Sequence, residues 1–150
     1  ARMSEEEMAA VVREQRVARA QANLAVGRDC LAGNASRPGV VVLPSGLQYQ
    51  VLARGTGAQA SAQDVVRVHY HGTRIDGSVF DSSVERGQPA EFPLTGVLPG
   101  FREGISLMSV GSHWQLAVPS ELAYGERGAG ADIGPNETLL FEIQLLDIVR

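Results

Sequence analysis

The spacing of hydrophobic residues changes near Pro38 and divides the chain into two parts. Before it, the stretch from Ser4 to about Ala32 consists mainly of Ala, Glu, Arg, Gln and Val, with no proline and one glycine, which is typical of a long helix. Ser4 and Glu7 have the spacing of a capping box, and the glutamates after Ser4 suit the positive end of the helix dipole. Gly33-Asn34 is expected to end the helix before Pro38.

The predicted helix is longer than the rest of the chain can cover. At about 1.5 Å per residue it measures about 42 Å, more than a domain of about 110 residues covers, so part of it is expected to project. Its apolar stripe is thin and rich in alanine, which suits packing against another helix: Met8, Val11, Val12, Ala18, Ala22 and Ala25. Two interpretations stay open, a solvated spacer and an arm for dimerisation or for reaching a partner.

After Pro38 the hydrophobic residues alternate with polar ones, which predicts short strands between turns. Asp76-Gly77 stands between two strand-like runs and is a strong hairpin signal. Residues 99–108, PGFREGISLM, read as one short helix with an apolar face. The alternating sets expected to face inward are Leu47, Tyr49 and Val51; Val66, Val68 and Tyr70; and Leu139, Phe141, Ile143 and Leu145.

These elements predict an α+β fold, in which a curved antiparallel β-sheet (a half-barrel) wraps over one short helix and is preceded by the long N-terminal helix. The expected division is an arm at residues 1–36 and a domain at residues 37–150.

The composition of the chain argues against several classes of function. The 13 basic and 17 acidic residues give a net charge of -4 and are scattered, so no face is set up to bind nucleic acid. The chain has no lysine, which excludes Schiff-base chemistry, and no apolar run approaches the length of a membrane span. The single cysteine, Cys30, cannot form an internal disulfide and leaves the redox compartment open.

Three motifs resemble sites for phosphate binding, metal binding or nucleophilic catalysis, but their context argues against each of these functions. The glycine-rich stretch YGERGAG at residues 124–130 leads toward a strand, whereas a phosphate-binding loop leads into a helix, so we expect these glycines to shape a long loop. His69 and His71 share the outward face of a strand and lack further metal ligands, so solvated histidines are favoured over a metal site. Ser82 and Ser83 follow Asp81, but no nucleophile elbow or designated base accompanies them.

Aromatic residues are the remaining signal. Phe92 and Trp114 are assigned mainly to the core. Tyr70 and Tyr124 carry hydroxyls that need partners if buried, and Asp81 brings a carboxylate to the end of the strand that contains Phe80. An apolar concavity with two hydroxyls and one acid is a typical ligand pocket.

At these residues the sequence resembles the FKBP family of peptidyl-prolyl cis/trans isomerases. The similar blocks are VRVHYHG, DGSVFDSS, PAEFPL, GVLPGFREGISLMSVG, LAYGERGAG and IGPNETLLFEIQLLDI, which follow the family's order from about Ser45 to the end of the chain. SGLQYQVLARGTG after a long helix is similar to the bacterial branch that contains the macrophage infectivity potentiator proteins. That resemblance implies a homodimer through the N-terminal region of the full-length protein. It also implies the periplasm or cell envelope of a bacterium, with the cytoplasm as the alternative.

The resemblance implies Tyr70, Asp81 and Tyr124 as catalytic residues, and it implies a further set that binds substrate or inhibitor: Phe80, Arg86, Val97, Leu98, Phe101, Ile133 and Phe141. The implied function is isomerisation of Xaa-Pro bonds in polypeptides, without a cofactor or metal and with inhibition by macrolides of the rapamycin type. The alternative is a chaperone or peptide-binding module with weak turnover. Phe101 stands where the family commonly has Trp, and Ala90 stands where some members have a bulky aromatic residue.

Overall fold

The long helix expected at the start of the chain is present in the computed structural model, which describes residues 2–149. Helix α1 spans Glu5–Ala35. Its capping box forms as predicted: Ser4 Oγ accepts a hydrogen bond from the Glu7 amide at 3.1 Å, and Glu7 Oε1 accepts one from the Ser4 amide. The helix ends three residues later than expected. Gly33 keeps a helical backbone, and Asn34 instead donates from its side chain to Gln48 at 2.8 Å, which ties the helix end to the sheet.

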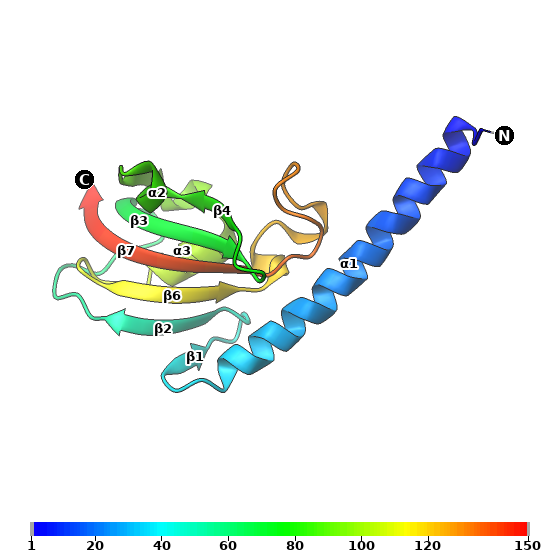
Figure 1. Cartoon of the computed structure of the whole chain (residues 1–150). Coiled ribbons are helices and arrows are strands. Elements are labelled where there is room, and N and C mark those ends of the chain that lie inside the picture. The colour runs from blue at the N-terminus through cyan, green and yellow to red at the C-terminus, as the bar shows by residue number, and fades with distance from the viewer. Residues whose placement is uncertain (1, 150) are drawn as a thin grey trace.

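The rest of the chain forms a seven-stranded antiparallel sheet in the order β1-β2-β6-β7-β3-β4, with β5 also paired to β3 (Figure 1). The strands are β1 Val40–Val42, β2 Gln48–Ala53, β3 Val65–Arg74, β4 Val79–Ser82, β5 Ala90–Pro93, β6 His113–Val118 and β7 Leu139–Val149. The helices that follow α1 are the one-turn α2 Ser83–Arg86 and α3 Pro99–Ile105. Short 3₁₀ turns occupy Leu94–Gly96, Ser120–Leu122 and Gly125–Arg127.

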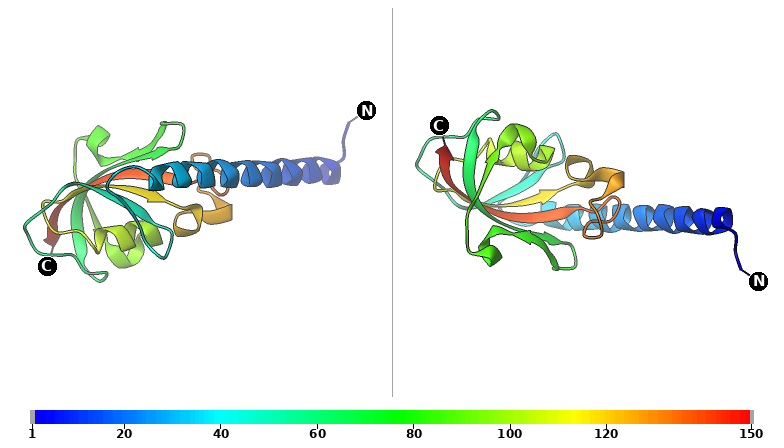
Figure 2. Two further views of the ribbon diagram at one scale, coloured as in Figure 1. Left: turned by 90° about the horizontal axis from the view of Figure 1, so that it is seen from below. Right: turned by 90° about the horizontal axis from the view of Figure 1, so that it is seen from above.

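The predicted fold class is confirmed, because this curved sheet packs one face against α3 (Figure 2). The hairpin at Asp76-Gly77 also forms: β3 and β4 pair, and Gly77 has φ +88°, a conformation that glycine adopts readily. Central strands β3 and β7 share ten register pairs and carry the expected inward residues. Those that are buried are Val66, Val68, Tyr70, Leu139, Phe141, Ile143 and Leu145.

A second apolar contact joins β2 to β6, away from the centre of the sheet. Tyr49 stacks on Trp114 with ring centroids 4.4 Å apart and an interplanar angle of 11°. These two residues lie on paired strands, where Val51 is the register partner of Trp114. Trp114 therefore belongs to the core, as the sequence predicted.

Helix α1 lies along the domain from about Arg16 to its C-terminal end, and its first turns extend beyond the domain (Figures 1 and 2). Among the described residues of α1 only Gly27 is buried. An added Cβ at Gly27 would lie 2.4 Å from Thr138 Oγ1, so glycine permits the close approach to the sheet. Met8 and Val12 of the extending part are 53% and 62% exposed. No helix within residues 2–149 has the length and apolar character needed to cross a bilayer.

Two glycines of α1 provide a matched test of this docking. Gly33→Ala meets nothing within 4 Å and should raise the free energy of unfolding by about 0.5–1 kcal/mol through helix propensity. Gly27→Ala should instead lower it, because the methyl group crowds Thr138 and overpacking costs about 1–3 kcal/mol. Urea unfolding followed by circular dichroism measures both. Equal stabilisation by the two substitutions would contradict the helix–sheet contact.

Candidate functional site

A hollow of about 290 Å³ opens at one end of the core, on the face of the sheet that α3 covers. Its walls come from β3, β4, β5, β7, the turn at Leu94–Gly96 and the start of α3. The lining residues are Tyr70, Phe80, Asp81, Phe92, Gly96, Val97, Leu98, Phe101, Tyr124 and Phe141. The structure therefore brings together eight of the ten residues singled out in the sequence, and it adds Phe92 and Gly96.

Phe101 forms the bottom of the hollow. It is only 5% exposed, and α3, which begins with Pro99 at its first turn, carries it beneath the sheet. Three rings surround it edge to face, at centroid distances of 5.9 Å for Tyr70, 5.8 Å for Phe92 and 5.3 Å for Phe141. Edge-to-face pairs contribute roughly 0.5–1.5 kcal/mol each beyond their buried area. The floor is thus a rigid part of the core that remains accessible from one side.

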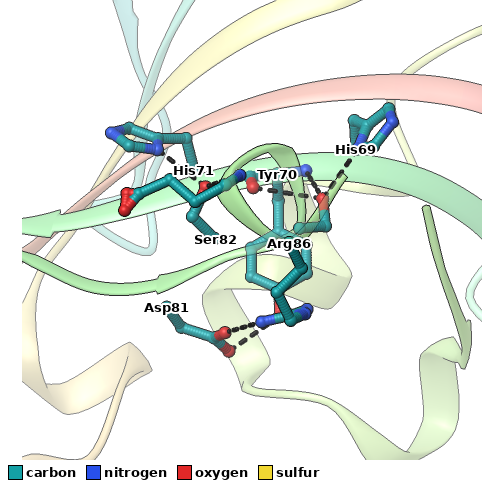
Figure 3. A network of polar contacts seen from close by, with 8 residues as sticks. His69, Tyr70, His71, Asp81, Ser82 and Arg86 are labelled. Carbon is teal, nitrogen blue, oxygen red and sulfur yellow. Dashed lines mark hydrogen bonds and ion pairs between the residues drawn. The ribbon is translucent and has the colours of Figure 1, made fainter. Parts of the chain in front are cut away.

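A polar group occupies one side of the rim (Figure 3). The Tyr70 hydroxyl donates to Asp81 Oδ2 at 2.7 Å, Arg86 Nη1 donates to Asp81 Oδ1 at 2.6 Å, and Arg86 Nη2 donates to the Tyr70 hydroxyl at 2.9 Å. The Arg86 guanidinium also lies 5.6 Å from the centre of the Tyr70 ring. Arg86 does not line the hollow, but it holds two residues that do.

The three groups orient one another more than they stabilise the fold. The side chains of Asp81 and Arg86 are 46% and 51% exposed, and ion pairs in such positions contribute little to stability. Burial raises the pKa of Tyr70, the hydrogen bond from Arg86 opposes that rise, and Asp81 adds to it. The pKa of Arg86 is raised by its hydrogen bonds to Tyr70 and Asp81. At neutral pH Tyr70 is therefore a neutral phenol that donates to Asp81 and accepts from Arg86.

Serine residues fasten this rim to β3. Ser82 Oγ caps α2 by accepting from the Glu85 amide at 3.1 Å, and it lies 2.8 Å from His71 Nδ1. Ser83 Oγ accepts from the Tyr70 amide at 2.7 Å and lies 2.9 Å from His69 Nδ1 (Figure 3).

The expectation of two solvated histidines is therefore wrong, although their outward direction is right. Both rings are half-buried, because the chain at Ser82 and Ser83 turns back against β3 and supplies partners for them.

The two serines are buried and use their oxygens in caps and strand contacts, so neither is an accessible nucleophile. Within residues 2–149, no group of three or more His, Cys, Asp or Glu side chains is close enough to hold a metal ion.

Tyr124 and Ile133 flank a glycine-rich loop, and the structure separates them. Tyr124 is 38% exposed and lines the hollow; burial raises its pKa, and the negative charge of Asp81 raises it further. Ile133 is buried in the core, and its backbone pairs with Ala129 in a small bridge. Its side chain lies outside the lining of the hollow.

Phe92 is the lining residue that sequence reasoning assigned elsewhere. It lies on β5, which pairs with β3, and its ring packs 5.7 Å from that of Tyr70 and 5.8 Å from that of Phe101. Core and hollow share one face of the sheet, so alternation along a strand cannot separate a core residue from a lining residue.

The raised pKa values of Tyr70 and Tyr124 predict how stability changes in alkali. Both hydroxyls ionise first in the unfolded chain, so their contribution is fully present below the ordinary pKa of 10.0 and is lost as pH rises through the higher folded values. The free energy of unfolding should therefore fall as pH rises above about 10. Tyr70→Phe combined with Tyr124→Phe should flatten that fall, whereas Tyr49→Phe, which keeps both pocket hydroxyls, should not. An unchanged slope in the double variant would contradict the prediction.

Comparison with known proteins places this geometry in a family. The family "FKBP-type peptidyl-prolyl cis-trans isomerase" matches residues 57–146, and "Domain amino terminal to FKBP-type peptidyl-prolyl isomerase" matches residues 1–51. The FKBP-type 22 kDa peptidyl-prolyl cis-trans isomerase of Escherichia coli is 55% identical over 95% of this chain and 68% of its own length. The outer membrane protein MIP of Legionella longbeachae is 51% identical over 88% of this chain and 57% of its own length.

Solved structures agree with the sequence comparison. The crystal structure of FkpA from Escherichia coli superposes with a TM-score of 0.88 at 36% identity, over 99% of this chain and 74% of that one. The chain spans between 57% and 74% of the length of these three proteins. The family matches, the relatives and the shared architecture lead to one conclusion: this chain belongs to the FKBP-type peptidyl-prolyl cis-trans isomerases.

Proposed function

We propose that the hollow between Tyr70, Asp81 and Tyr124 is where this chain accelerates the cis-trans isomerisation of Xaa-Pro bonds. The observation that carries the proposal is the distribution of polarity: apolar side chains, most of them aromatic, form the floor and walls, and polar side chains occur only at the rim. Such a site accepts a proline ring and leaves the adjoining peptide groups within reach of hydrogen-bond partners. Substrates are proline-containing polypeptides, with a preference for an apolar residue before proline.

Prolyl isomerisation requires little more than an apolar site of this kind. Rotation about a peptide C–N bond breaks its resonance at a barrier of about 18–20 kcal/mol, so uncatalysed prolyl isomerisation takes tens to hundreds of seconds. The twisted bond carries less charge on its oxygen than the planar one. Surroundings with little water therefore favour the transition state over the ground state. No covalent intermediate is needed.

Each part of the hollow has a role in this proposal. Phe101 is the floor under the proline ring, and the walls are Phe80, Val97, Leu98 and Phe141, with Ile133 supporting the loop behind Tyr124. The Tyr124 hydroxyl has no hydrogen-bond partner within residues 2–149. This hydroxyl and the Leu98 amide hold the carbonyl groups of the substrate. Phe101 in place of an indole gives a smaller platform, which changes affinity for large ligands.

Asp81 acts by position and not as a base. Its two oxygens already accept hydrogen bonds from Arg86 and Tyr70, and isomerisation moves no proton in net terms. The carboxylate thus fixes the rim against which the substrate backbone lies. A catalytic rate that stays flat across neutral pH supports this role, and a rate that follows one carboxyl titration contradicts it.

An exchange assay with an Xaa-Pro peptide tests the proposal. The purified chain should accelerate cis-trans exchange, and rapamycin should abolish the acceleration by filling the hollow. Asp81→Leu should lower kcat/KM by about 10- to 100-fold, since misplaced positioning groups cost up to that much, without changing the circular dichroism spectrum. Asp29→Leu, an exposed position on α1, should leave kcat/KM unchanged. An inactive wild-type chain would refute the enzymatic function.

The N-terminal part has a proposed role as well. Residues 1–36 form an arm and residues 37–150 the isomerase domain, a division supported by β1, which begins at Val40 and pairs with β2 of the sheet. Because the arm exposes apolar side chains, we propose that it contacts a second copy of the protein. The cell envelope of a bacterium is the proposed compartment, supported by the relative named an outer membrane protein.

The exposed apolar residues of the arm also favour a second candidate function, capture of unfolded chains with weak turnover. Refolding of a proline-limited protein and of a proline-free one separates the two functions. An isomerase should accelerate only the first by shortening its slow phase, whereas a pure holdase should treat both alike. Equal effects on the two proteins would favour capture over catalysis.

A further inference from the structure

The loop at residues 125–136 follows Tyr124, which lines the hollow, and lies beside α1 (Figure 1, orange). Its base is closed by the Asn136 amide, which donates to Gly125 O at 2.9 Å, and Ala129 and Ile133 exchange backbone hydrogen bonds in its middle. Tyr124 directly precedes the closed base. The orientation of Tyr124 therefore depends on where this loop is held.

Helix α1 binds both ends of the loop through side chains. Arg16 Nη2 donates to Glu126 O at 2.8 Å and to Arg127 O at 2.9 Å, next to Tyr124. Asn23 Nδ2 donates to Pro135 O at 2.9 Å at the far end. A bond in the opposite direction runs from Asn136 Nδ2 to Ala20 O at 3.3 Å.

The helix presents these contacts on a single face. Arg16, Ala20, Asn23 and Gly27 follow one another at spacings of four, three and four, which keeps them on one side of a helix. Gly27 brings that side against Thr138, which lies two residues after the loop and directly before β7. Glycine at 27 thus sets the distance at which Arg16 and Asn23 reach the loop.

The loop offers these side chains backbone carbonyl groups that accept no other hydrogen bond within residues 2–149. Gly125–Arg127 is a single 3₁₀ turn, whose last carbonyls have no acceptor role inside the turn. Asn136 has φ +59°, a left-handed conformation that few residues other than glycine adopt. On the opposite side, Arg74 of β3 donates to Asp132 O from Nε at 2.6 Å. The loop is therefore held between the sheet and the arm.

We infer that Arg16 and Asn23 are positioning residues for the isomerase site: from the arm, they fix the loop that orients Tyr124 at the rim of the hollow. This inference rests on the proposed function, because it assigns Tyr124 to substrate binding. According to this inference, side chains of the arm help to position a substrate-binding residue, in addition to any contact that the arm makes with another molecule.

Kinetics of single and double variants test the inference. Arg16→Ala should lower kcat/KM for an Xaa-Pro peptide by several-fold to about tenfold, mainly through KM, because the hydroxyl that holds the substrate carbonyl is displaced. Arg16→Lys should recover part of the loss, since an ammonium can still donate to a carbonyl. Arg13→Ala is the control, because Arg13 is exposed on the same helix and makes none of these hydrogen bonds.

A double-mutant cycle separates positioning through Tyr124 from any other effect. In the Tyr124→Phe background, Arg16→Ala and Asn23→Ala should lower kcat/KM little further, because the hydroxyl they position is already absent. Losses that multiply fully would overturn the inference, as would an Arg16→Ala variant equal to Arg13→Ala. A wild-type chain without activity would refute the proposed function instead, so the two failures are distinguishable. Hydrogen exchange at Ala129 and Ile133 should also quicken in Arg16→Ala, and unchanged exchange would contradict the inference.

Discussion

The packing of Phe101 against three rings is the constraint on which the rest of the structure depends. The curved sheet must bury its inner face, and α3 is the element that covers it. Because α3 has only seven residues, it cannot cover the whole concavity, and the rings around Phe101 form the boundary between the covered and uncovered parts. The same contacts therefore complete the core and shape the hollow. Stability and ligand binding are joined at this residue.

Polar groups are placed so that they do not disturb this apolar boundary. Tyr70 reaches from the buried face of β3 to Asp81 and Arg86 at the surface, where both charges stay half exposed. Ser82 and Ser83 then fasten the turn that carries Arg86 to the two histidines on the outer face of β3. Strand β3 thus supports the hollow from both of its faces. One face supplies the phenol, and the other anchors the chain that carries its partners.

Much of this arrangement was predictable because it follows from local periodicity. Alternation along β3 and β7, the Asp76-Gly77 turn and the capping box at Ser4 all appear in the structure as the sequence indicated. Contacts between distant segments were not predictable in this way. The late end of α1 depends on Asn34 meeting Gln48, and the pairing of histidines with serines depends on how β4 turns into α2.

The candidate site, too, was predictable only where it did not depend on contacts between distant segments. Resemblance to a family located most of the lining, but Phe92 and Ile133 exchange the places expected of them, because one face of the sheet serves both core and hollow. Hydrogen bonds between α1 and the loop join residues more than a hundred positions apart, and no periodic signal marks them. Such contacts emerge only when the helix and the loop are seen side by side.

The position of the single tryptophan has a practical consequence for spectroscopy. Trp114 stacks on Tyr49 between β2 and β6, and the floor of the hollow is a phenylalanine, which emits very weakly. Indole emission from this protein therefore reports the packing between β2 and β6, and it comes from a residue that does not line the hollow. Because a ligand in the hollow would not contact Trp114 directly, indole emission can serve to follow unfolding at saturating ligand.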